Sequence, residues 1–146
     1  MQFWQKFLKE NNFSNIDFLY NNSYEVEGNI IAGTRGWVQS NEQEDKKMIN
    51  RESIRLEISI EDGIQKFGED KPIIICMHYP PYTNYNKQNL IDSPFIEIMR
   101  KYNVKKFIFS SSATVYGEPE RIPLTEECKI GGTTNPYGTT KLFIEQ

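Results

Sequence analysis

The chain has 146 residues, enough for one domain and too few for two of ordinary size. Its 17 Lys and Arg against 20 Asp and Glu give a formal net charge of −3, which provides no basic surface for nucleic acid or an anionic membrane. With 38% hydrophobic and 13% aromatic residues, the chain is too rich in core-forming side chains to be disordered.

The sequence carries no export or membrane signal. The longest apolar run, at 73–77, is too short to span a bilayer, and the first residues lack the apolar core of a signal peptide. Cys76 and Cys128 are therefore expected as free thiols in a reducing compartment. These features predict a cytoplasmic α/β-type protein with no nucleic-acid or membrane partner.

The amino-terminal residues predict a helix followed by short strands. Apolar side chains fall on one side of a helix over 3–10, and bulky residues between Asn-rich turns predict a strand at 16–20. Alternation predicts a half-exposed strand at 24–26, and the turn signal at Gly28 predicts that a third strand follows at 30–32.

A long helix and two predicted strands come next, with a shorter helix between the strands. Apolar residues spaced by four and three predict an amphipathic helix over 44–67 that ends at Gly68. The run at 73–77 is typical of a strand buried on both faces. Ser93 before a proline predicts a helix start, and a second buried strand is expected at 104–109. This order of strand, helix and strand predicts a parallel βαβ unit.

The rest of the chain reads as a polar loop over 117–134 and a final helix opened by Asn135-Pro136. Together the elements predict an α/β fold. It has a parallel βαβ core, additional N-terminal strands and a long amphipathic helix.

The strongest chemical signal is a tyrosine and a lysine on this last helix. Tyr137 and Lys141 are four residues apart, so they share one helical face. A lysine ammonium beside a phenol favours the phenolate, which is the form that acts as a base. A hydroxyl at the end of a buried strand can orient the substrate oxygen that such a tyrosine deprotonates. Taken alone, the pair is more often an accident of a solvated helix.

The surroundings of the pair form a longer pattern. Residues 99–109 lead into Ser-Ser-Ser-Ala-Thr-Val-Tyr-Gly at 110–117, and Asn-Pro-Tyr-Gly-Thr-Thr-Lys occupies 135–141. With these motifs, residues 99–146 closely resemble the UDP-glucose 4-epimerase family, within the extended short-chain dehydrogenases/reductases.

This resemblance implies a cofactor, a substrate and three site residues. Tyr137 is the expected catalytic base, Lys141 holds the nicotinamide ribose and tunes the tyrosine, and Ser112 contacts the sugar hydroxyl. All three then belong to the catalytic and NAD-binding set, and the substrate is a nucleotide sugar. In the family reaction NAD oxidises C4 of the hexose, the keto-sugar rotates, and hydride returns to its other face.

One essential part of that family is missing from the sequence. The family opens with a Gly-rich turn between strand and helix whose backbone amides receive the dinucleotide pyrophosphate. Gly33-Thr34-Arg35-Gly36 has the wrong spacing for this turn, and the sugar-nucleotide domain expected after Gln146 is absent too. We therefore expect this chain to be inactive as an epimerase.

Residues 1–104 carry a different set of motifs. Gly-Thr-Arg-Gly-Trp at 33–37 and Met-His-Tyr-Pro-Pro at 77–81 resemble the C-terminal half of a bacterial calcineurin-like metallophosphoesterase. This resemblance implies that His78, the one histidine of the sequence, ligates a divalent metal pair. The family's other ligand motifs do not occur, and one histidine cannot hold two metals. A polar residue at a strand end, without a metal, is the alternative for His78.

The two resemblances meet near residues 99–106, which we interpret as the seam of a truncated chimera. A partial metallophosphoesterase-like segment, 1–104, then overlaps a partial epimerase/dehydratase segment, 99–146. The first hypothesis for function is an inactive fragment of a UDP-glucose 4-epimerase. The alternatives are a remnant of a metal-dependent phosphoesterase and a non-enzymatic module.

Overall fold

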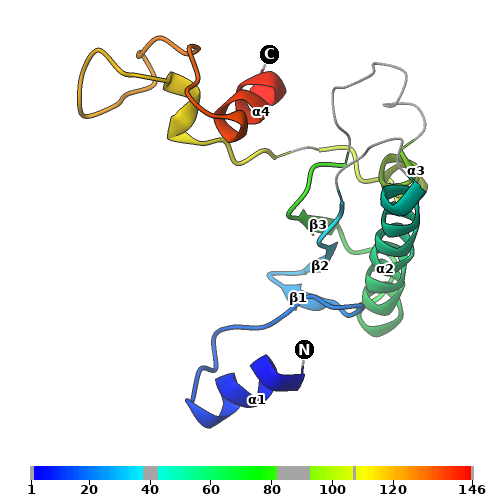
Figure 1. Cartoon of the computed structure of the whole chain (residues 1–146). Coiled ribbons are helices and arrows are strands. Elements are labelled where there is room, and N and C mark those ends of the chain that lie inside the picture. The colour runs from blue at the N-terminus through cyan, green and yellow to red at the C-terminus, as the bar shows by residue number, and fades with distance from the viewer. Residues whose placement is uncertain (1, 38–42, 82–92, 107, 146) are drawn as a thin grey trace. The chain divides into compact units, whose positions relative to one another are not determined.

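The computed structural model describes most of the chain (Figure 1), namely residues 2–37, 43–81, 93–106 and 108–145. The chain divides into two compact units, Met1–Lys105 and Lys106–Gln146. Among the described residues, no helix combines the length and the apolar character needed to cross a membrane.

The first unit contains a three-stranded sheet in the order β1-β2-β3. β1 (Tyr24–Val26) runs antiparallel to β2 (Asn29–Thr34), and β3 (Ile73–Met77) runs parallel to β2. Glu27 and Gly28 form the hairpin turn with φ of 49° and 78°, the positive values that a two-residue turn of this kind requires. The predicted strands at 24–26 and 30–32 and the turn at Gly28 are thus confirmed.

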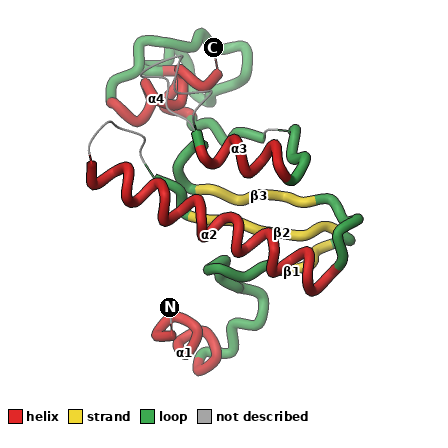
Figure 2. Tube along the Cα trace, turned by 90° about the vertical axis from the view of Figure 1, so that its right-hand side faces the viewer, coloured by secondary structure: helices red, strands yellow, loops and turns green. Residues whose placement is uncertain are grey.

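The parallel βαβ unit is built from β2, α2 (Gln43–Phe67) and β3. α2 and α3 (Pro94–Lys101) cover one face of the sheet (Figure 2). Their apolar side chains pack with those of β2 in the core, which comprises Ile30, Ala32, Leu56, Ile60, Phe95 and Ile98. A parallel βαβ core and a long amphipathic helix were both predicted, but the predicted unit joined the strand at 73–77 to a later segment.

In that later segment, 104–109, the described residues form no strand. Its described residues, 104–106 and 108–109, belong to no ladder, and the Ile108 side chain is 94% exposed. The amide of Val104 instead donates to the carbonyl of Met99, 2.8 Å away, and so closes the end of α3. The prediction was wrong because a segment becomes a strand only where a neighbouring strand supplies hydrogen bonds.

Two other strand predictions also fail. Residues 16–20 are irregular, and the carbonyl of Phe18 accepts a hydrogen bond from the side-chain hydroxyl of Tyr24 at 3.3 Å, which is not a ladder hydrogen bond. β3 is not buried on both faces, because Ile74 is 45% exposed and Cys76 is exposed as well. Ile73, Ile75 and Met77, on its other face, are half-buried against the core. An apolar run such as that of β3 does not show whether helices cover one face of the sheet or both. In the part of the chain that the structure describes, the helices cover one face.

The helices agree with the sequence more closely than the strands do. α1 (Gln2–Glu10), α2 and α3 lie where the apolar spacing predicts them. Ser93 is the residue before α3, as expected, but its hydroxyl donates to the carbonyl of Pro81 and does not cap the helix. Gly68 follows α2 with a φ of 99°, which suits a glycine at a helix end.

The second unit consists of the 3-10 turn η2 (Ala113–Tyr116), an irregular loop and α4 (Pro136–Glu145). Gly117 lets the loop fold back on η2, because its φ is 60° and a Cβ there would lie 2.4 Å from the carbonyl oxygen of Gly132. The amide of Gly131 donates to the carbonyl of Val115 at 2.8 Å across the same contact. The predicted loop and final helix are both confirmed.

Candidate functional site

The predicted catalytic pair lies on α4 in the second unit. Asn135 caps this helix, because its Oδ1 atom accepts a hydrogen bond from the amide of Gly138 at 2.7 Å. The cap sets the start of the helix, and the four-residue spacing then places Lys141 one turn beyond Tyr137. The Lys141 Nζ atom lies 5.4 Å from the centre of the Tyr137 ring, and the tyrosine side chain is 55% exposed. The structure therefore brings these two residues together.

Lys141 has two further contacts, both near the serine motif. Its Nζ atom donates to the carbonyl oxygen of Ser110 at 3.0 Å and lies 4.7 Å from the centre of the Phe109 ring. These contacts hold the ammonium between the start of the serine motif and the tyrosine. A positive charge in this position favours a negative charge on a nearby oxygen.

Ser112, the third predicted residue, is the N-cap of η2. Its backbone is extended, with φ −150° and ψ 146°. Its Oγ atom accepts hydrogen bonds from the amide of Thr114 at 3.3 Å and from the Thr114 hydroxyl at 3.0 Å. Ser112 thus stands at the beginning of a short turn and not at the end of the strand expected before it.

The turn that carries Ser112 and the helix that carries Tyr137 are in direct contact. A Cβ on Gly138 would lie 2.9 Å from the carbonyl oxygen of Thr114 and 3.1 Å from its Cβ. Only a glycine next to Tyr137 permits so close an approach. Sequence reasoning missed Thr114 and Gly138, although both lie inside the recognised motifs, because their role depends on a contact between residues distant along the chain.

The structure also allows a test of whether the first unit can receive a dinucleotide pyrophosphate. The amide of Gly33 already donates to the Ser59 hydroxyl at 3.0 Å, and a Cβ on Gly33 would lie 2.3 Å from the carbonyl oxygen of Cys76. A Cβ on Gly36 would lie 3.0 Å from the Met77 side chain. These glycines serve the packing of β2 against β3. The Gly33–Gly36 segment therefore does not fit the pyrophosphate of NAD.

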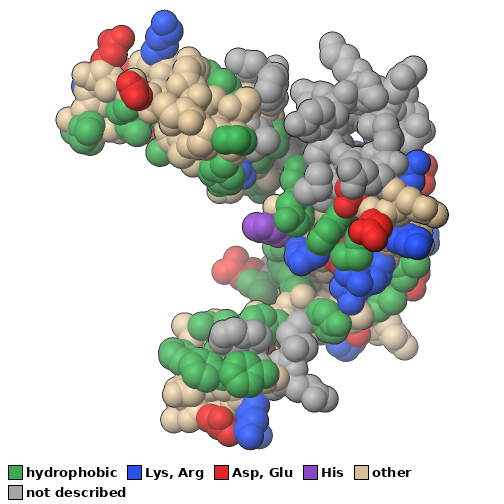
Figure 3. Space-filling view, viewed as in Figure 1, with side chains coloured by type: hydrophobic (Ala, Val, Ile, Leu, Met, Phe, Trp, Pro, Cys, Tyr) green, Lys and Arg blue, Asp and Glu red, His purple; other side chains and the backbone are tan. Residues whose placement is uncertain are grey.

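His78, the predicted metal ligand, follows β3 and is exposed at the surface (Figure 3). Its ring meets the Tyr79 ring edge to face, with the ring centres 4.9 Å apart. Within the described parts of the chain, no three or more His, Cys, Asp or Glu side chains converge into a group that could hold a metal ion. The structure thus places His78 beside the aromatic ring of Tyr79.

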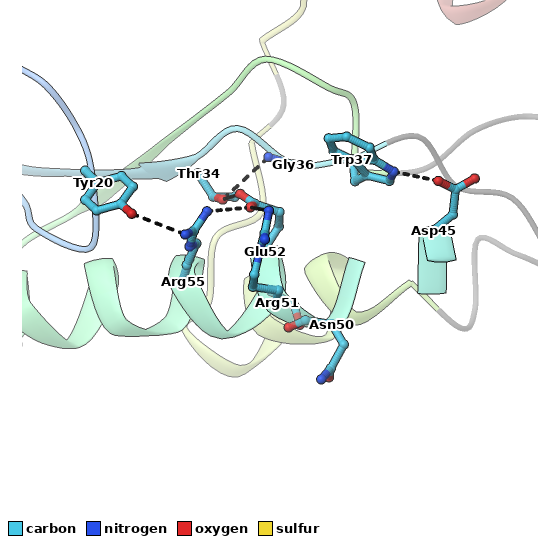
Figure 4. Close-up of polar contacts among 10 residues, drawn as sticks. Tyr20, Thr34, Gly36, Trp37, Asp45, Asn50, Arg51, Glu52 and Arg55 are labelled. Carbon is cyan, nitrogen blue, oxygen red and sulfur yellow. Dashed lines mark hydrogen bonds and ion pairs between the residues drawn. The ribbon is translucent and has the colours of Figure 1, made fainter. Parts of the chain in front are cut away.

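The first unit contains a buried carboxylate that the sequence did not single out (Figure 4). The Glu52 side chain, 2% exposed, accepts hydrogen bonds from Arg55 and from the Thr34 hydroxyl, each at 2.7 Å. Arg55 also donates to the Tyr20 hydroxyl at 3.3 Å. Both carboxylate oxygens are therefore paired. The cluster joins α2 to the end of β2 and needs no ligand to complete it.

Comparison with known proteins identifies relatives of this chain. The sequence model of the NAD dependent epimerase/dehydratase family matches residues 27–146. The UDP-glucose 4-epimerase of Yersinia enterocolitica is 52% identical over 87 residues, which are 58% of this chain and 23% of that protein. The enzyme of Bacillus subtilis is 64% identical over 86 residues, 58% of this chain and 22% of that protein.

The UDP-glucose 4-epimerase of Pasteurella multocida is 67% identical over 51 residues, 35% of this chain and 15% of that protein. The chain thus spans less than a quarter of the length of these relatives. No solved structure matches it. The family match begins at residue 27, inside the segment that resembles a metallophosphoesterase, and the comparisons lend the chimera no support.

Proposed function

We propose that this chain, which belongs to the NAD dependent epimerase/dehydratase family, carries the proton-transfer part of a site for a nucleotide sugar. One observation carries the proposal. The helix that holds Tyr137 beside the Lys141 ammonium also packs, through Gly138, on the turn that holds Ser112. In this proposal Tyr137 and Ser112 face the same oxygen of the sugar.

The proposed chemistry follows from these three side chains. The Tyr137 phenolate accepts the proton of a sugar hydroxyl, and the Lys141 ammonium favours the phenolate by its charge. Ser112 donates a hydrogen bond to the same sugar oxygen and orients it. The similarity to UDP-glucose 4-epimerases supports a UDP-hexose as the substrate class and its C4 hydroxyl as the reacting group.

The family description implies NAD, which would supply a hydride acceptor beside the sugar carbon. Tyr137 and Lys141 suit the nicotinamide end of such a cofactor, whereas the glycines of the first unit do not suit its pyrophosphate. We therefore propose that the chain by itself neither holds NAD tightly nor interconverts UDP-glucose and UDP-galactose.

The test is a titration of the purified chain with UDP-galactose, followed by NMR of labelled tyrosine rings. We expect the Tyr137 resonance to shift with weak affinity, and we expect Ser112→Ala to weaken the binding. Tyr79→Phe, in the first unit, is the matched control and should bind as the parent does. A Tyr137 resonance that stays unchanged at saturating UDP-galactose would remove the proposed substrate site.

The inactivity of the isolated chain has its own test. A coupled assay for UDP-glucose formation, with NAD added, should give no turnover above the Tyr137→Phe variant. NAD that co-purifies in near-stoichiometric amount, or measurable epimerisation, would contradict this part of the proposal.

A further inference from the structure

The hydroxyl of Ser112 is held by one neighbour in a way that restricts its chemistry. We propose that Thr114 is a positioning residue of this site, which fixes Ser112 as a hydrogen-bond donor toward the substrate oxygen. That the Ser112 hydroxyl donates to a substrate oxygen rests on the proposed function. The hydrogen-bond arrangement itself can be tested without any substrate.

The hydroxyl of Ser112 can make a limited number of hydrogen bonds. A serine hydroxyl has one proton to donate and two lone pairs that accept. Thr114 supplies a donor to each lone pair, its amide at 3.3 Å and its own hydroxyl at 3.0 Å. Among the hydrogen bonds of the described residues, the Ser112 proton has no protein acceptor. Ser112 is partly exposed, so this proton can be directed out of the turn.

The consequence concerns the direction of proton transfer. With both lone pairs occupied, Ser112 cannot take the proton of the sugar hydroxyl and pass it to Tyr137. The proton moves directly from the sugar oxygen to the Tyr137 phenolate oxygen. Ser112 keeps its own proton and stabilises the alkoxide that forms, in the manner of an oxyanion-hole donor.

Thr114 is also the residue through which the turn contacts the tyrosine helix. Its carbonyl oxygen and side chain are the atoms nearest to a Cβ built on Gly138, at 2.9 Å and 3.1 Å. One residue therefore orients the Ser112 hydroxyl and sets the distance of α4 from the turn. Through Thr114, a shift of α4, which carries Tyr137, would also change the orientation of the Ser112 hydroxyl.

The experiment replaces the serine oxygen by a sulfur whose ionisation can be measured. Cys76→Ala and Cys128→Ser remove the native thiols, and Ser112→Cys then introduces a single thiol in place of the hydroxyl. The rate of its alkylation by iodoacetamide between pH 6 and 10 gives its pKa, because the thiolate is the reactive form. Two donors from Thr114 should hold this pKa below the ordinary thiol value of about 8.5.

Removal of one donor should raise that pKa. Thr114→Val, which keeps the size of the side chain and removes its hydroxyl, is expected to raise the thiol pKa by about one unit. Thr114→Ser restores a hydroxyl and should restore the low value. Thr133→Val is the matched control, since Thr133 pairs with the Thr139 hydroxyl at 2.7 Å in the same unit and does not bond Ser112. It should leave the pKa unchanged.

Equal thiol pKa values in the parent and in Thr114→Val would overturn the inference. Circular dichroism shows whether each variant is folded, and Thr114→Ala carries the same test if the valine variant is not. The thiol pKa could depend on Thr114 in a chain that binds no UDP-galactose. That result would support the hydrogen-bond arrangement and contradict the proposed function. The two failures are therefore distinguishable.

Discussion

The two units of this chain differ in what holds them together. In the first, Met1–Lys105, two helices cover a sheet and enclose an apolar core in which Ile30, Leu56 and Phe95 are fully buried. In the second, Lys106–Gln146, Val115 is the one buried hydrophobic residue among those whose burial the structure describes, a set that leaves out Phe143. The second unit relies instead on hydrogen bonds and on glycines that allow close backbone contact.

The proposed chemistry lies in the unit with the smaller core. Tyr137, Lys141 and Ser112 are positioned by a cap at Asn135, by the hydrogen bonds of Thr114 and by the glycine contact at 138. Apolar burial is the largest source of folding free energy, so the first unit is expected to be the more stable of the two. The recognisable sequence motifs therefore lie in the second unit, whereas the larger apolar core lies in the first.

The largest expected effect is that of Leu56→Ala in the first unit. Leu56 is fully buried, and removal of such a side chain should lower the free energy of unfolding by about 2–5 kcal/mol. Val115→Ala in the second unit removes two carbons and should cost about 1.5 kcal/mol. Hydrogen exchange with mass spectrometry resolves the peptides of each unit. Equal loss of protection in both units after Leu56→Ala would show that they unfold as one body.

Gly138→Ala probes the contact on which the second unit depends. Alanine favours a helix by about 1 kcal/mol over glycine, but its Cβ would lie 2.9 Å from the Thr114 carbonyl oxygen and should cost about 1–3 kcal/mol. We expect faster hydrogen exchange in η2 while α4 stays helical. Glu145→Ala, at the exposed end of α4, is the control. Unchanged exchange in η2 would mean that the contact does not stabilise the unit.

The first unit should lose stability in acid through Asp62. Burial alone raises the pKa of this carboxyl, but hydrogen bonds from Lys66 and Ser23 outweigh it and hold the pKa below its usual value of 3.8. Because the folded pKa is the lower one, the stabilisation is present above pH 3.8 and is lost as the pH falls through the folded pKa. Denaturant unfolding between pH 2 and 7 measures this loss.

Asp62→Asn should remove that part of the acid dependence, and Asp70→Asn, at an exposed turn, is the matched control. If both variants lose stability in acid as the parent does, other carboxyls cause the loss. Hydrogen exchange would assign the loss to the first unit, since the Asp62 carboxylate and the Ser23 groups that bond it both belong to that unit.

The smallest expected effect is that of His78→Ala on metal binding. The described residues offer His78 no cluster of further ligands, so affinity for Mn²⁺ or Zn²⁺ should be weak in the parent and equal in the variant. Calorimetric titration with each metal measures it. A micromolar site that disappears in His78→Ala, with hydrolysis of a generic phosphodiester in Mn²⁺, would instead favour the phosphoesterase hypothesis.

The sequence by itself determined the features that depend on near neighbours. The period of α2, the cap at Asn135, the turn at Gly28 and the shared face of Tyr137 and Lys141 all involve residues within a few positions of one another. Helical hydrogen bonds join residues four apart, so a short window of sequence contains both partners. The proximity of Tyr137 and Lys141 was predictable for this reason.

Tertiary structure alone decided which strands pair and which surfaces are covered. β3 pairs with β2, and the segment at 104–109 joins no ladder in its described residues, although the sequence predicts a strand in both places. The close approach of Gly138 to Thr114 was likewise decided by tertiary structure. Such contacts join distant residues, and they form only where the rest of the fold brings both partners together. No local pattern records whether that happens.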